Sequence, residues 1–220
     1  MNAFPYQTYH AANNMASKAH AKFIKTIRRC ESLVASYKKL HELHSNDTAT
    51  PAPKDIVRGA IVLSVSALDA YVTDVFAEKF VAYIKRFEPD ENLIELLNDA
   101  GLNTKVALEL IEMDRPYRRI RTLIQQHYNK YTTQKFEVID RLFATYRLPK
   151  ICTSAQRKSK RKTLNNSIKK LIDRRHEIAH SGDYNSHGKI RDIDEVLFGK
   201  RIQHLELFVT SMDEIICNRI

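Results

Sequence analysis

The sequence has little glycine and proline, no tryptophan and only three cysteines among its 220 residues. Five glycines and six prolines exclude a collagen-like or low-complexity chain, and a hydrophobic fraction of 43% excludes a wholly disordered one. No uninterrupted apolar run approaches the roughly 18 residues that a membrane-spanning helix needs. The first 30 residues also lack the basic and apolar regions of a secretory signal. We therefore expect a globular chain with no membrane partner.

The cysteines exclude two kinds of structural cross-link. Cys30, Cys152 and Cys217 are odd in number and far apart, so they indicate neither a disulfide framework nor a CxxC metal knuckle. Unpaired thiols are typical of a reducing compartment, and we expect a cytoplasmic protein.

The net charge of +10 is concentrated in one part of the chain. Residues 115–175 carry +15, whereas residues 1–114 carry −2 and residues 176–220 carry −3. Such a block attracts phosphates and long polyanions, although a basic run can also be a solvated face with a flexible loop. The polyanion interpretation predicts RNA binding by two clusters, Arg118, Arg119 and Arg121 in one and Arg157, Lys158, Lys160, Arg161 and Lys162 in the other.

Nearly every segment has the apolar spacing of an amphipathic helix, and no strand is predicted. Four long helices are expected at 15–45, 54–86, 163–180 and 190–218, with shorter ones at 91–98, 104–113, 115–130 and 134–146. The second helix is apolar or small on nearly every side from Ala60 to Leu68, so we place it at the centre. The basic run 156–162 is expected to be a loop or a frayed helix start. The last helix is expected to turn Val196 and Leu197 inward.

These elements predict an all-α fold, a helical bundle built on about four long helices. We expect one domain over residues 1–220. Residues 87–160 would form a helical, basic insert between the second and third long helices.

The segment at the end of the third long helix holds the candidate chemistry. His176, Glu177 and His180 form an HExxH pattern, in which two histidines one turn apart bind zinc and the glutamate activates water. An extended zinc-peptidase pattern would continue with glycine and histidine at positions that hold Asp183 and Ser186. Zinc peptidases of this kind also use strands to shape the substrate cleft, and the sequence predicts none. A zinc metallopeptidase is therefore the least favoured alternative.

The second pattern in this segment is Arg175-x4-His180. With its flanks Arg-Arg-His-Glu-Ile-Ala-His-Ser-Gly-Asp, the string from Ser66 to Val72 and the closing helix 190–220, it resembles the HEPN superfamily (higher eukaryotes and prokaryotes nucleotide-binding). The flanks look like those of stand-alone and defence-associated members, including the RiboL-PSP-HEPN group. In that signature the arginine is often followed by a polar residue, here His176. The insert departs from the compact family pattern.

The resemblance implies a metal-independent endoribonuclease without a cofactor. The 2′-OH of RNA attacks the neighbouring phosphate, so neither a metal nor an external nucleophile is required. His180 would move protons, because its reference pKa lies near neutral pH. Arg175 would hold the phosphate and stabilise its developing charge. The products would be a 2′,3′-cyclic phosphate and a 5′-OH, and DNA would not be cleaved.

Helix geometry constrains this site. Residues five apart differ by roughly 140° around a straight helix, so Arg175 and His180 share a face only if the helix frays at Ser181 or if Arg175 reaches around. One imidazole also cannot readily act as base and acid at once. In the HEPN family two protomers join their motifs across a two-fold axis, and we expect a homodimer with a composite site.

Supporting roles are assigned to Arg174, His176, Glu177 and Asp69. Asp69 lies on a mostly apolar helix and either makes a local hydrogen bond or pairs with Arg174 or Arg175 to aim it. Glu177 either holds an arginine or faces solvent, and the pattern slightly favours solvent.

Two functions of different classes follow. The first is a ribonuclease that acts as a toxin or antiphage effector on tRNA or other RNA, with an antitoxin or sensor protein as a possible partner. The second is a non-catalytic HEPN module that binds RNA, nucleotide or a partner protein, with Arg175 and His180 structural.

Overall fold

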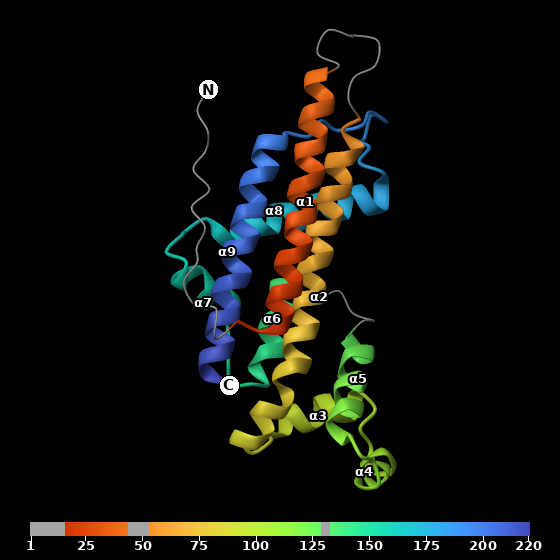
Figure 1. Cartoon of the computed structure of the whole chain (residues 1–220), viewed down its shortest axis with the longest axis vertical. Coiled ribbons are helices and arrows are strands. Elements are labelled where there is room, and N and C mark those ends of the chain that lie inside the picture. The colour runs from red at the N-terminus through yellow and green to blue at the C-terminus, as the bar shows by residue number, and fades with distance from the viewer. Residues whose placement is uncertain (1–15, 44–52, 129–132) are drawn as a thin grey trace.

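The computed structural model describes residues 16–43, 53–128 and 133–220, and these residues form nine helices (Figure 1). In chain order they are α1 Lys18–Leu43, α2 Asp55–Arg86, α3 Glu91–Asp99, α4 Thr104–Ile111, α5 Pro116–Tyr128, α6 Phe136–Ala144, α7 Ile151–Lys158, α8 Leu164–Ser181 and α9 Glu195–Arg219. The described residues contain no strand, only an isolated antiparallel bridge between Tyr184 and Ile190. The predicted all-α fold is confirmed.

The four long predicted helices correspond to α1, α2, α8 and α9. Residue 15, residues 44–45 and residues 129–130 of the predicted helices lie outside the described part of the chain. α9 begins at Glu195 rather than at 190, because the Asp194 side chain accepts hydrogen bonds from the backbone N–H groups of Val196 and Leu197 and caps the helix there.

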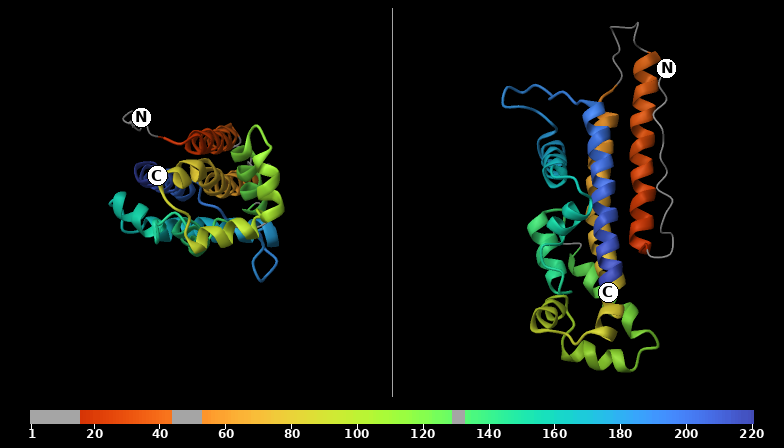
Figure 2. Two further views of the ribbon diagram at one scale, coloured as in Figure 1. Left: turned by 90° about the horizontal axis from the view of Figure 1, so that it is seen from below. Right: turned by 90° about the vertical axis from the view of Figure 1, so that its left-hand side faces the viewer.

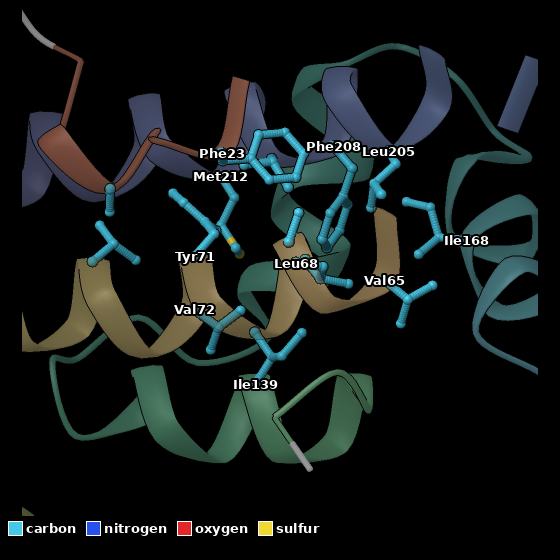
Figure 3. Packing of buried hydrophobic residues seen from close by; sticks show 14 of the residues in the cluster. Phe23, Val65, Leu68, Tyr71, Val72, Ile139, Ile168, Leu205, Phe208 and Met212 are labelled. Atoms are coloured by element: carbon cyan, nitrogen blue, oxygen red, sulfur yellow. The ribbon is translucent and has the colours of Figure 1, made fainter. Parts of the chain in front are cut away.

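α2 is the central helix, as predicted. It packs against α1, α5, α8 and α9, and α1, α2 and α9 run along the length of the molecule while α8 crosses them (Figures 1 and 2). Its side chains Leu68, Tyr71, Val72 and Phe76 are almost fully buried. Figure 3 shows Leu68, Tyr71 and Val72 close to the side chains of Phe208 and Met212 of α9, Phe23 of α1 and Ile139 of α6. Burial of this apolar surface is the main force that assembles the bundle.

The apolar composition of α2 is explained by its burial in the bundle. By length and composition alone α2 could cross a membrane, but 67% of its most apolar window is buried inside the structure. A core helix of a folded bundle has the same composition, so the hydropathy of α2 is weak support for a membrane span.

The basic run differs from its prediction. Arg157 and Lys158 form the last turn of α7, whereas residues 159–162 are outside any helix, so the predicted loop covers only the second half of the run. α7 is stabilised by the buried side chains of Ile151, Cys152 and Ala155. The sequence did not predict this helix, because the charged residues that follow them are typical of a loop.

Val196 and Leu197 were also predicted wrongly. They are 55% and 43% exposed, because the inward stripe of α9 begins at Phe198 and continues through Ile202 and Leu205. At about 100° per residue, Val196 and Leu197 lie far around the helix from that stripe.

Candidate Arg-His site on α8

α8 places the candidate motif at the end of a well-packed helix. Its residues Leu164, Ile168 and Leu171 are buried, and the helix packs on α2 and α9. The helix ends at Gly182, whose φ of 61° is the left-handed conformation that glycine adopts at little cost. The backbone N–H groups of Gly182 and Asp183 both donate to the carbonyl oxygen of Glu177, which closes the last turn.

The helix remains regular through Ser181, so fraying does not bring Arg175 and His180 to one face. Arg175 continues the inward stripe of Ile168 and Leu171 and is half-buried, whereas His180 is exposed. The two residues are separated by roughly 140° around the axis.

His176 and His180 do share a face, as the sequence predicted. Both are exposed, and their ring centroids are 4.3 Å apart. Throughout the described residues, no group of three His, Cys, Asp or Glu side chains is placed to hold a metal ion. The HExxH pattern therefore has no third ligand in the described part of the chain.

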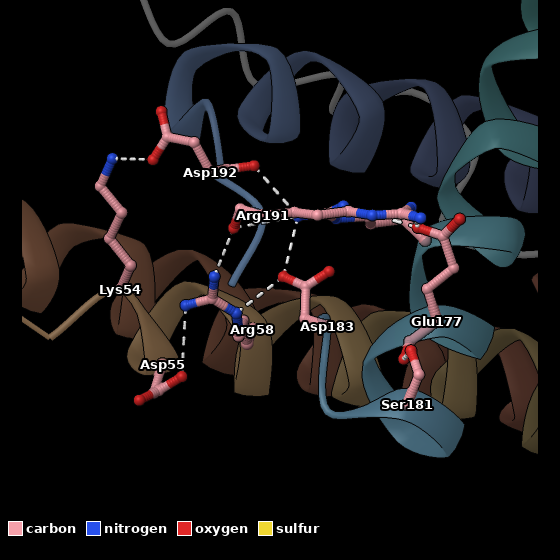
Figure 4. Close-up of polar contacts among 9 residues, drawn as sticks. Lys54, Asp55, Arg58, Glu177, Ser181, Asp183, Arg191 and Asp192 are labelled. Carbon is pink, nitrogen blue, oxygen red and sulfur yellow. Dashed lines mark hydrogen bonds and ion pairs between the residues drawn. The ribbon is translucent and has the colours of Figure 1, made fainter. Parts of the chain in front are cut away.

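Arg174 is committed to an internal ion pair. Its guanidinium donates to Asp183 Oδ2 at 2.8 Å and to the backbone oxygen of Asp192 at 3.0 Å. Arg58, from the first turn of α2, donates through Nε to the same Asp183 oxygen at 2.8 Å and through Nη2 to the backbone oxygen of Arg191 at 2.6 Å (Figure 4). We call Arg58, Arg174 and Asp183 the Asp183 cluster.

The Asp183 cluster is buried. The Asp183 side chain is 0% exposed and those of Arg58 and Arg174 are 11% and 16% exposed. It joins the start of α2, the end of α8 and the segment that leads into α9. Charge pairing inside the fold is effective because little water competes for these groups.

Ion pairs at the rim of the cluster tie down the same segment. The carboxylate of Glu177 forms ion pairs with the guanidinium of Arg191 at 2.5 Å and with that of Arg174 at 3.5 Å. It therefore holds two arginines, contrary to the solvent-facing role that the sequence slightly favoured. Lys54 pairs with Asp192 (Figure 4). The sequence did not identify Arg58 or Asp183 as site residues. The position of Arg58 does indicate such a role, because a charged side chain on an apolar helix needs a partner.

Arg175 contrasts with its neighbour Arg174. Within the described residues it makes no hydrogen bond or ion pair, and its Nε is buried without a partner. Its guanidinium is therefore not neutralised by any described carboxylate and can bind an anion.

Asp69 does not pair with either arginine, which corrects that part of the prediction. Its carboxylate accepts hydrogen bonds from the backbone N–H of Thr133, at 2.8 Å, and from the Thr133 hydroxyl. Asp69 therefore fastens the chain that enters α6 to α2, and Asp183 takes the role of holding Arg174.

The two basic clusters lie apart from the motif and from each other. The run 157–162 covers the end of α7 and the turn before α8, and its last residue, Lys162, lies about 27 Å from His180 along the axis of α8. Arg118 and Arg119 line an open hollow of about 760 Å³ beside α4 and α5, at the lower end of the molecule in Figure 1. The side chains of both clusters are exposed.

An all-α bundle with an Arg-x4-His motif in the last turns of a long helix has the features of a HEPN domain. The chain belongs to the RiboL-PSP-HEPN family, whose model matches residues 25–218. No curated protein and no solved structure matches the chain. Family membership supports a HEPN-type, nucleic-acid-related function, and HEPN proteins are commonly ribonucleases.

Proposed function

We propose that the protein is a metal-independent endoribonuclease that uses Arg175 and His180. The observation that carries this proposal is the contrast between adjacent arginines: Arg174 is neutralised by Asp183, whereas Arg175 has no partner within the described residues. An arginine without a partner can bind a phosphate, and the exposed His180, five residues later on the same helix, can move protons once a second protomer completes the site.

The reaction would be an internal transesterification. A base removes the proton of the ribose 2′-OH, and the 2′ oxygen attacks phosphorus. The bond between phosphorus and the 5′ oxygen breaks, and an acid protonates that oxygen. Arg175 would hold the non-bridging phosphate oxygens and stabilise their charge as the 2′,3′-cyclic phosphate forms.

A second copy of the chain would complete the site. Because α8 is regular through Ser181, Arg175 and His180 of one protomer point in directions about 140° apart. A two-fold axis beside the end of α8 would let the motifs of two protomers face one another and supply one imidazole as base and another as acid. His176, with its ring 4.3 Å from that of His180, would support the proton transfers.

Cleavage of labelled RNA in excess EDTA tests the proposal. We expect the native chain to release a product with a 2′,3′-cyclic phosphate and to leave the matched DNA intact. His180→Ala should abolish cleavage without changing the circular dichroism spectrum, while the control His187→Ala, an exposed loop histidine, should cleave normally. Undiminished cleavage by His180→Ala would remove this histidine from the mechanism, and an inert native chain would favour the non-catalytic binding module.

The proposal extends to biological role and partners. The basic clusters at Arg157–Lys162 and Arg118–Arg121 would bind a long RNA such as a tRNA outside the motif. A ribonuclease of this kind would act as a toxin or antiphage effector, and an antitoxin or sensor protein would restrain it. Profiling RNA ends in cells that express the native chain or His180→Ala would test this role.

A further inference from the structure

The contact between α8 and α9 contains a second arginine that the motif does not include. His204 of α9 hydrogen-bonds through Nδ1 to the hydroxyl of Ser167 on α8 at 2.8 Å, which turns this side of α9 toward α8. Arg201 lies one turn before His204 on the same side, beside the buried residues Phe198 and Ile202. Its position is therefore on the seam between the two helices, toward the motif end.

Arg201 resembles Arg175 in lacking a partner. It is half-buried and makes no hydrogen bond or ion pair within the described residues. Burial lowers the pKa of Arg201, and the nearby charge of Arg174 lowers it further, whereas Asp194 opposes the shift. Asp194 is itself engaged, since its carboxylate caps α9.

These surroundings favour an anion. Two guanidinium groups close enough to repel each other are destabilising unless a negative charge lies near them. Arg174 has such a charge in Asp183, but Arg201 has no ion-pair partner in the described part of the chain. A phosphate would supply the missing charge, and a guanidinium fork binds phosphate through two parallel hydrogen bonds.

We propose that Arg201, on the α8–α9 seam beside Arg174, binds a second phosphate of the RNA strand, distinct from the phosphate held by Arg175. This inference rests on the proposed function, because it takes RNA as the ligand of the motif. It assigns α9 a part in substrate binding, outside the Arg175–His180 motif. Arg201 touches the RNA backbone only, so it adds affinity without base preference.

Salt-dependent binding tests this assignment without relying on cleavage. A fluorescein-labelled single-stranded RNA of mixed sequence, about 20 nucleotides long to exceed the site sizes of single-strand binders, is titrated with the His180→Ala chain at several KCl concentrations. In that background Arg201→Ala should weaken binding about tenfold, the loss expected for a charge-assisted hydrogen bond. It should also flatten the slope of log K against log salt by about 0.7, the value for one phosphate on a single strand.

Two matched variants separate a specific contact from a general loss of charge. Lys200→Ala removes the same charge one residue away on an exposed position and should change affinity less than about twofold. Arg201→Lys should keep the salt slope and recover part of the affinity, because lysine retains the charge but not the fork. In the native background, Arg201→Ala should raise KM for RNA and leave kcat nearly unchanged.

The outcomes distinguish this proposal from the enzymatic one. If Arg201→Ala and Lys200→Ala give the same affinity and slope, Arg201 does not contact a phosphate. If Arg201→Ala shows the binding defect but the native chain cuts no RNA, only the proposed ribonuclease activity fails. A His180→Ala chain that binds no RNA, together with a native chain that cuts none, would overturn both.

Discussion

Replacement of Asp183 by asparagine should destabilise the fold by about 3 kcal/mol, although it changes one side-chain atom. Asp183 is 0% exposed and binds Arg58 and Arg174 through one oxygen, each at 2.8 Å. Removing one partner of a buried pair leaves an uncompensated charge and typically costs about 3–5 kcal/mol. Here two guanidinium groups lose their buried carboxylate, but Arg58 keeps Asp55 at 3.2 Å, Arg174 keeps Glu177 at 3.5 Å and the amide oxygen still accepts, which places the loss at the lower end. The backbone adds no strain, because asparagine tolerates the φ of 65° at this position.

Urea unfolding followed by circular dichroism measures this loss, and the melting temperature should fall by roughly 6–12 °C for a chain of this size. Asp192→Asn is the matched control. Asp192 lies on the same segment and pairs with Lys54, but its side chain is 81% exposed. Exposed pairs contribute little to stability, because water and salt screen them. A loss no larger for Asp183→Asn than for Asp192→Asn would refute the role of the Asp183 cluster in holding the end of α8.

Three further predictions concern single side chains. Arg175→Lys keeps the charge but loses the planar fork, so RNA cleavage should fall at least about tenfold in a gel assay, and full activity would contradict the proposed role of Arg175. Burial, and to a lesser extent the charge of Arg161, lower the pKa of His204. The contribution of His204 to the free energy of unfolding is therefore complete above about pH 6.5 and is lost as the pH falls. His204→Gln should reduce the drop in the urea midpoint between pH 7.5 and pH 5.5. Finally, a thiol reagent should modify Cys217 before the other cysteines, as peptide mass mapping can verify, since burial raises the pKa of Cys30 to about 11 and that of Cys152 further.

The long helices could be predicted because their periodicity is strong. α2 and α8 each carry apolar residues at three- and four-residue spacings, and the structure has both within two residues of the predicted bounds. α7 shows where this reasoning fails. Its buried residues Ile151, Cys152 and Ala155 give only two turns of pattern, and the charges that follow suggested a loop. A helix this short is stabilised by packing on α9, which the local sequence does not contain.

The motif residues could be found by spacing, but their partners could not. Asp183 lies nine residues after Arg174 and 125 residues after Arg58, and only the packing of α2 against α8 brings the three together. The sequence suggested Asp69 as a partner for the motif arginines, because a carboxylate on a mostly apolar helix needs a partner. Asp69 instead accepts hydrogen bonds from Thr133, and the carboxylate that meets the arginines, Asp183, lies just after α8.

Adjacent arginines with opposite roles illustrate why the fold is needed to interpret the motif. Consecutive residues of a helix differ by about 100° in direction, which turns Arg174 toward the segment 183–192 and leaves Arg175 on the stripe of Leu171. Arg174 is neutralised by a buried carboxylate, so a phosphate would have to compete with Asp183 for it. Arg175 has a buried Nε with no partner in the described residues, and an unsatisfied buried donor costs about 1–3 kcal/mol. In the proposed function, a phosphate would give the guanidinium of Arg175 the anionic partner that Arg174 already has in Asp183.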